Sequence, residues 1–177
     1  MLQQQVESSK KWSERDGIIY LTVTSDGTTG QEWIKRLEEK GSQLTDEVKS
    51  LLCSIYFNPT SGVTTEIAIL PGKRFEDKER NRSWIETVAF GLHKFTRPNA
   101  EVACYIREIF TNEELEQMEL KYILTMHEPL FDSISDPFFL ISFPHDGVSG
   151  LGSDYAVDVM GHEYDVHTGF AFAVSQK

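Results

Sequence analysis

The chain has 177 residues, of which 40% are hydrophobic and 25% are charged, a composition typical of a folded globular protein rather than a disordered one. Its length suits one domain with a core large enough to fold without disulfide bonds or a structural metal. Lysine and arginine number 17 against 28 aspartate and glutamate residues, and the formal charge of −11 argues against a protein that binds nucleic acid.

Residues 1–16 form a polar N-terminal segment, and residues 17–177 are predicted to form a single globular domain. The N-terminal segment lacks the apolar stretch of a secretory signal. No part of the chain reaches the roughly 20 apolar residues that a membrane span needs. Cys53 and Cys104 belong to no CxxC pair and have apolar neighbours, so both are expected as buried free thiols. These features predict a soluble, cytoplasmic protein with no membrane contact.

The first predicted element is a strand over residues 18–24 (IIYLTVT), which is rich in β-branched and aromatic residues. A helix is expected next, because Thr29 and Glu32 have the spacing of a capping box, in which each side chain binds the other residue's backbone N–H. This helix should end near Lys40, since Gly41 is a suitable stop.

The second predicted helix has the clearest apolar period. Thr45 is a suitable N-cap, and Asn58-Pro59 marks the end of the element. Apolar residues recur between them at the helical spacing i, i+3, i+4 and i+7, namely at Val48, Leu51, Leu52 and Ile55. This spacing predicts one apolar face that includes all four.

The later elements are shorter. Residues 66–70 are predicted as a strand and residues 83–95 as a helix. Residues 102–110 (VACYIREIF) alternate loosely between apolar and polar side chains, which favours a strand. A second capping box, formed by Thr111 and Glu114, begins a short helix. Further strands are expected at residues 122–126, 138–143 and 170–174.

This order of elements alternates in the first half of the chain and is rich in strands in the second half. It predicts an α+β fold, or a mixed α/β fold. We expect a single domain with a central mixed sheet of about five or six strands and three or four helices packed on it.

The turn between the first strand and the first helix is a candidate anion-binding site. Thr28, Thr29 and Gly30 offer hydroxyl and backbone N–H groups at a helix N-terminus, where the helix dipole also favours negative charge. No Gly-Lys-Ser/Thr follows, so the segment is not a Walker A loop. The alternative is a strand-to-helix turn whose residues only cap the helix.

A second candidate is His127, which follows the strand at residues 122–126 and precedes Glu128, Asp132 and Asp136. A histidine beside carboxylates could act as a general base or supply a metal ligand. His127 and Glu128 would point to opposite faces of a strand, so only one of them would face a given pocket. The alternative is a histidine with a structural role.

The third candidate is the segment 145–167, which is rich in glycine, histidine and aspartate. Such side chains bind Zn²⁺ or another divalent ion. Together with His127, the candidate ligands are therefore His162, Glu163, Asp165 and His167. As a strand, this segment would place Glu163, Asp165 and His167 on one face. The alternative is a solvated acidic loop, since the spacing is not that of a His-Glu-x-x-His helix.

Two functions remain open at this point. The first is a small acidic, non-catalytic interaction or regulatory protein, antitoxin-like or immunity-like, whose surface attracts a basic protein partner. The second is a metal-dependent enzyme or ligand-binding domain that uses the segment 145–167 with a divalent metal as cofactor. No catalytic motif is recognisable, which favours the first.

Overall fold

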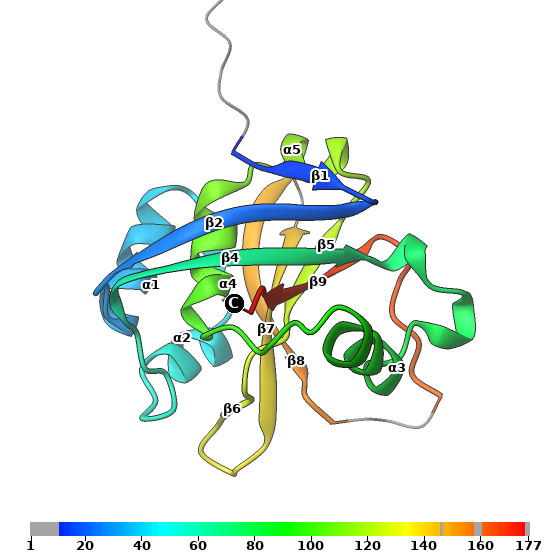
Figure 1. Cartoon of the computed structure of the whole chain (residues 1–177). Coiled ribbons are helices and arrows are strands. Elements are labelled where there is room, and N and C mark those ends of the chain that lie inside the picture. The colour runs from blue at the N-terminus through cyan, green and yellow to red at the C-terminus, as the bar shows by residue number, and fades with distance from the viewer. Residues whose placement is uncertain (1–10, 146, 158–160, 176–177) are drawn as a thin grey trace, which may run out of the picture.

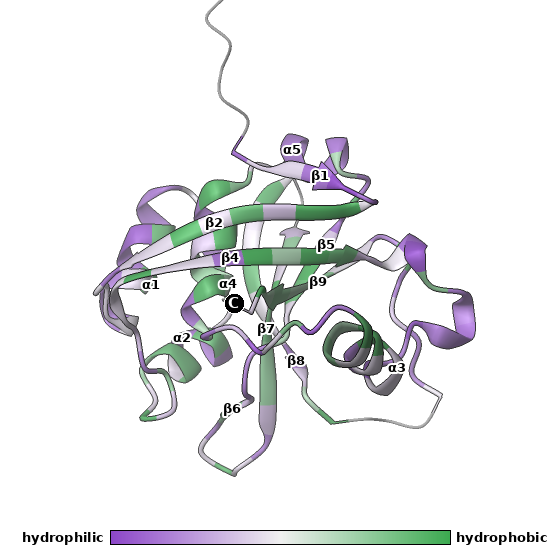
Figure 2. Ribbon diagram, in the orientation of Figure 1, coloured by the Kyte–Doolittle hydropathy of each residue, from purple (hydrophilic) through white to green (hydrophobic). Residues whose placement is uncertain are grey.

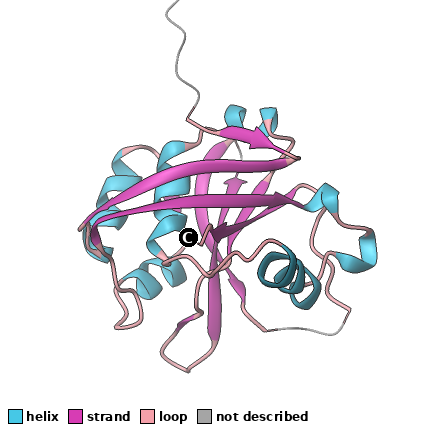
Figure 3. Cartoon of the chain, viewed as in Figure 1, coloured by secondary structure: helices cyan, strands magenta, loops and turns pink. Residues whose placement is uncertain are grey.

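The computed structural model describes residues 11–145, 147–157 and 161–175, and in these residues nine strands form one mixed sheet with helices on both faces (Figures 1 and 3). The strand order is β1-β2-β4-β9-β5-β7-β8-β3, and β6 pairs with β7 beside this path. The strands are β1 (Ser13–Arg15), β2 (Ile18–Asp26), β3 (Gln43–Leu44), β4 (Ser61–Pro71), β5 (Tyr122–Thr125), β6 (Leu130–Phe131), β7 (Pro137–His145), β8 (Val148–Tyr155) and β9 (Thr168–Ala173). The single domain of mixed α and β structure is as predicted, but five or six strands was too low a number.

Four strands account for the difference in number. β1, β3 and β6 are two or three residues long, too short for an alternating pattern, and exist because longer strands pair with them. The fourth is β8, whose glycines resemble those of a loop. A Cβ atom on Gly150 or Gly152 would lie 2.8 or 2.7 Å from the ring of Phe143 on the neighbouring strand, so these glycines make room for that ring.

The helices are mostly short, and four of the five α-helices in the described residues begin at a side-chain N-cap. Both predicted capping boxes are present, and Thr45 caps the second helix as expected. The α-helices are α1 (Gly30–Glu39), α2 (Asp46–Leu52), α3 (Arg82–Glu86), α4 (Glu101–Ile109) and α5 (Asn112–Gln117). A π-helical segment, η3 (Thr87–Leu92), continues α3, and two short 3₁₀ turns, η1 (Gly72–Arg74) and η2 (Asp77–Glu79), follow β4. Among the described residues, no helix has the length and apolar character to span a membrane.

The sheet separates two hydrophobic clusters. On one face, α1, α2, α4 and α5 pack around residues such as Trp33, Leu51 and Ile106. On the other face, α3 and η3 cover a cluster that includes Ile85 and Phe172. Figure 2 shows the apolar stretches along β2, β4, β7 and β9, in the middle of the sheet.

Residues 102–110, predicted as a strand, belong instead to helix α4. Every residue from Glu101 to Arg107 is buried, because α4 lies between the sheet and its neighbouring helices. Its residues 102–106 form an uninterrupted apolar run, and so short a run does not by itself distinguish a buried helix from a strand.

Helix α2 ends one turn earlier than predicted, at Leu52. The backbone N–H and the hydroxyl of Ser54 both donate to the carbonyl oxygen of Leu51, at 3.1 and 2.7 Å. These bonds occupy a carbonyl oxygen that a longer helix would use for its own hydrogen bond. Phe57 then turns into the core and is 6% exposed, whereas Ile55 is 85% exposed. Cys53, at the helix end, is exposed rather than buried, while Cys104 is buried as expected; both thiols are free.

Candidate functional site

His127 lies in the core, and both of its ring nitrogens have backbone partners. Its Nε2 accepts the backbone N–H of Leu140 in β7 at 3.0 Å, and Nδ1 is 2.6 Å from the carbonyl oxygen of Glu128. An acceptor role for Nε2 places the proton on Nδ1, which donates to that carbonyl. Burial lowers the pKa of His127 to about 4, so the ring is neutral at pH 7. A metal could bind His127 only if one of these hydrogen bonds broke.

The other four candidate ligands lie in an exposed turn before β9; they are His162, Glu163, Asp165 and His167. The segment is not a strand, because Asp165 forms a turn and the backbone of Tyr164 bonds to Arg80 in a loop rather than to a strand. The carboxylate of Asp165 accepts the N–H of His167 at 2.7 Å, and its carbonyl oxygen accepts the N–H of Thr168 at 3.0 Å. The shared strand face that would align three of these side chains is therefore absent from the turn.

The candidate ligands also face different neighbours. The ring of His162 packs edge-to-face on Tyr164, with 4.9 Å between centroids, whereas Nδ1 of His167 lies 3.3 Å from the carbonyl oxygen of Glu119. Within the described residues, no three His, Cys, Asp or Glu side chains come together as a metal site. Asp146 and Asp158, in the same segment of the sequence, lie outside the described residues.

The turn that holds Thr28, Thr29 and Gly30 uses its donors internally. The N–H and hydroxyl of Thr28 both donate to Asp26 Oδ1, at 3.1 and 2.5 Å. Those of Thr29 both donate to Glu32 Oε2, at 2.8 Å. Gly30 is buried at the start of α1. An external anion at this turn would have to displace two carboxylates of the chain itself.

Asp26 also links the turn to α1 and α4. It accepts hydrogen bonds from Arg36 at 2.6 Å and from the hydroxyl of Tyr105 at 2.9 Å. The bonds from Thr28 and Arg36 hold the pKa of Asp26 well below its usual range, and burial raises the pKa of Tyr105 to about 12. Arg36 in turn binds the carboxylate of Glu108 through two bonds of 2.6 Å. The network fixes the turn in place and satisfies its own charges.

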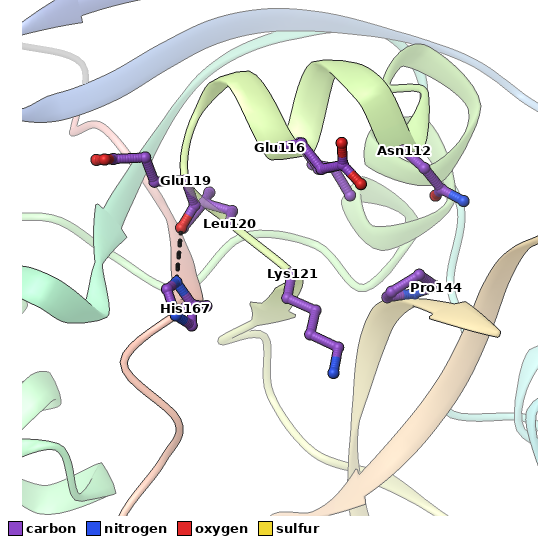
Figure 4. Close-up of a pocket in the computed structure, with 8 residues that line it drawn as sticks. Asn112, Glu116, Glu119, Leu120, Lys121, Pro144 and His167 are labelled. Carbon is purple, nitrogen blue, oxygen red and sulfur yellow. Dashed lines mark hydrogen bonds between the residues drawn. The ribbon is translucent and has the colours of Figure 1, made fainter. Parts of the chain in front are cut away.

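A cavity of about 470 Å³ opens beside α5 and includes His167 (Figure 4). Its size is that of a small-molecule site. Leu115, Leu120 and Pro144 supply apolar lining, and the polar lining residues are Asn112, Glu116, Glu119, Lys121 and His167. Figure 4 shows the amine of Lys121 extending into the open side, away from the His167 ring, which is turned toward Glu119.

Lys121 supplies this cavity with a positive charge. The neighbouring Tyr122 side chain raises the pKa of Lys121, so the amine stays protonated at neutral pH and is a poor nucleophile or general base. Its Nζ also lies 5.2 Å from the centroid of the Tyr122 ring. The arrangement suits binding of a polar or anionic group rather than proton abstraction.

A second feature lies at the other end of β7, where large apolar side chains face solvent. We call it the aromatic surface; its members are the exposed Ile55, Tyr56, Ile134 and Tyr155 and the half-buried Phe131. Ile55 and Ile134 are 85% and 75% exposed, and the two tyrosines are about half exposed. The ring centroids of Tyr56 and Phe131 are 5.1 Å apart, which joins the loop after α2 to the β6–β7 hairpin (Figure 1).

Carboxylates surround this surface. The hydroxyl of Tyr155 lies 3.4 Å from the carboxylate of Asp136, and Ser153 donates a hydrogen bond to Glu47 from the same strand. Asp132 lies in the same hairpin, since its carboxylate accepts the backbone N–H of Asp136 at 2.8 Å, and the negative charge of Asp136 raises the pKa of Tyr155. The aromatic surface therefore has an acidic rim.

Comparison with protein-family models, with curated proteins and with solved structures finds no match for this chain.

The aromatic surface was not predicted from the sequence. Ile55 continues the helical period of α2, and nothing in the pattern reports that Ser54 ends the helix before it. Phe131 and Ile134 lie near Asp132 and Asp136, the carboxylates noted in the sequence after His127. The exposure of the Phe131 and Ile134 side chains, however, is set by the β6–β7 hairpin and not by the local sequence.

Replacing Ile55 by serine is expected to change the free energy of unfolding by less than about 0.5 kcal/mol, because its side chain buries little surface. Replacing Leu52 by alanine, one turn earlier and 2% exposed, should cost about 2–5 kcal/mol. Urea denaturation of both variants checks this. A large loss for Ile55→Ser would mean that this side chain is packed in the folded protein.

Proposed function

We propose that this protein is a non-catalytic binding module of the cytoplasm that docks a basic protein partner through the aromatic surface. Its role would be regulatory, antitoxin-like or immunity-like. The observation that carries the proposal is the coincidence, at one end of the sheet, of exposed aliphatic and aromatic side chains with a rim of carboxylates.

The apolar side chains supply the affinity. Fully burying an isoleucine or a tyrosine ring is worth about 1.5–3 kcal/mol, and Ile55 and Ile134 obtain little of this within the chain. Tyrosine is enriched among the residues that dominate binding energies, and a contiguous apolar patch with a polar rim is the usual anatomy of a protein interface. Tyr56 and Tyr155 fit this role.

The charge selects the partner. Glu47, Asp132 and Asp136 border the aromatic surface, in a chain whose formal charge is −11. A complementary surface has an apolar centre ringed by lysine or arginine, and opposite charges accelerate the encounter of two proteins. Binding of this kind weakens as salt is raised.

Affinity capture with paired baits tests the proposal. The wild-type chain and a Leu92→Ser control, altered at an exposed residue of η3, should each retain one basic protein in stoichiometric amount at low salt. The double variant Ile55→Ser/Tyr56→Ser should bind that protein at least about 30-fold more weakly, the effect of losing roughly 2 kcal/mol at a central contact.

Three results would contradict the proposal. One is that no stoichiometric protein is retained at low salt. The second is that the double variant retains the partner as well as the Leu92→Ser control does. The third is that the retained protein is acidic and its binding does not depend on salt.

A further inference from the structure

The cavity beside α5 (Figure 4) combines an apolar lining with exposed charged side chains. Its volume is about 470 Å³, and most of its accessible lining is apolar. Leu115 and Leu120 are only 2% and 3% exposed, so the half-buried Pro144 and the aliphatic parts of exposed polar residues supply much of this lining. A cavity of this size and character favours a small ligand with an apolar body.

Lys121 is an accessible positive charge of this cavity. Its side chain is exposed, and within the described residues it forms no ion pair with a carboxylate. Its Nζ lies beside the ring of Tyr122, and the amine is protonated at neutral pH. The amine can therefore bind an oxyanion of a ligand without first breaking an ion pair.

Glu116 is an accessible negative charge of the same cavity. It is exposed on α5, and in the part of the chain that the structure describes no hydrogen bond or ion pair engages its carboxylate. The other carboxylate of the cavity, that of Glu119, is paired with Lys73. Figure 4 shows the carboxylate of Glu116 and the amine of Lys121 apart from one another. The cavity therefore offers a ligand both an open carboxylate and an open ammonium group.

We propose that this cavity binds a small zwitterion with an apolar body, of the size of a hydrophobic amino acid or a dipeptide. The amine of Lys121 donates to the carboxylate of the ligand, and the ammonium group of the ligand donates to the carboxylate of Glu116. The apolar body lies against Pro144. A ligand with only one charge would leave one of the two side chains without a counter-charge.

The zwitterion site lies away from the aromatic surface. Phe131 pairs with Pro137 at one end of β7, and the cavity includes Pro144 near the other end. The stretch of strand between these two prolines spans roughly 20–25 Å. The ligand and the protein partner can therefore be bound at the same time.

Thermal unfolding of the full chain at pH 7 tests the proposal with three probes that share one apolar body. L-Phenylalanine carries both charges, 3-phenylpropanoate lacks the ammonium group, and 2-phenylethylamine lacks the carboxylate. We expect L-phenylalanine, at about 10 times its Kd, to raise Tm by about 3–6 °C, and each single-charge probe at the same concentration to raise it less. L-Leucine, 4-methylpentanoate and 3-methylbutylamine form a second set with a smaller apolar body.

Two variants assign the charges. Lys121→Met should make the amino acid bind no better than the amine probe, and Glu116→Gln should make it bind no better than the carboxylate probe. Each variant should weaken binding of the amino acid by roughly 10-fold, the loss of one charge-assisted bond. Both side chains are exposed, so Tm without ligand should change little. Lys35→Met and Glu39→Gln, which alter an exposed ion pair of α1, are the matched controls and should retain the full shift.

Any of three results would overturn the zwitterion site. One is that no probe of either set changes Tm. Another is that a single-charge probe raises the Tm of the wild type as much as its parent amino acid does. The third is that the amino acid gives the same shift in wild type, Lys121→Met and Glu116→Gln, which would place the ligand elsewhere.

Discussion

Gly30→Ala is expected to destabilise the protein by at least about 3 kcal/mol, the upper range for forcing an extra methyl into a packed interior. A Cβ atom on Gly30 would lie 1.8 Å from the carbonyl oxygen of Leu52 and 2.6 Å from its carbonyl carbon. Both are backbone atoms, so no side-chain rotation relieves the overlap. The start of α1 would have to move away from the end of α2.

Gly91→Ala is the matched control. A Cβ atom there meets no atom within 4 Å. Its cost should be within about 0.5 kcal/mol, and the lower entropy of the unfolded chain can make it stabilising. Urea denaturation in a buffer without phosphate or sulfate compares the two. If Gly30 were required only for close approach to an anion, Gly30→Ala would be as stable as Gly91→Ala in that buffer, which would refute the packing role.

His127 is expected to make the protein sensitive to acid. The folded state holds the pKa of His127 at about 4, against 6.5 for the unperturbed group. Between these values the unfolded chain binds a proton that the folded chain does not, so stability falls as pH decreases from 6.5 to 4. The loss is about 3 kcal/mol, since each unit of pKa difference corresponds to about 1.4 kcal/mol.

His127→Leu isolates this contribution. At pH 7 it leaves the N–H of Leu140 and the carbonyl of Glu128 without partners, at a cost of about 3 kcal/mol. As the pH is lowered to 4, the difference from wild type should shrink toward zero, because the variant has no proton to bind at this position. A control, His162→Gln, replaces an exposed ring and should lose little stability at pH 7.

A difference between wild type and His127→Leu that is constant from pH 7 to pH 4 would contradict the buried neutral imidazole. It would mean instead that the ring is accessible and able to hold a proton in the folded state. That result would support the prediction that His127 is a metal ligand.

The features that the sequence predicted correctly are local. Capping boxes require only two side chains three residues apart, so Thr29 with Glu32 and Thr111 with Glu114 were recognisable. The features it missed depend on tertiary partners. Helix α4 buries even its charged residues Glu101 and Arg107 because other elements enclose it, and β8 contains glycines because the ring of Phe143 lies over them.

The candidate sites divide in the same way. The formal charge of −11 is a sum over residues, so it is read directly from the sequence. His127 was identified as notable, but its two backbone partners belong to β7 and to its own chain neighbour and leave no sequence pattern. Glu116 and Lys121 lie in the polar sequence around the end of α5, and only the packed structure shows that both line one cavity.

Site-specific photo-crosslinking tests the proposed function most directly. A benzophenone amino acid is placed at Tyr56, within the aromatic surface, or at Trp84, an exposed aromatic residue of α3 on the opposite face of the sheet. Illumination in lysate at low salt should give a single adduct with one basic protein from position 56, reduced by high salt, and no such adduct from position 84. The same adduct from both positions, or an adduct from position 84 alone, would contradict a partner docked on the aromatic surface.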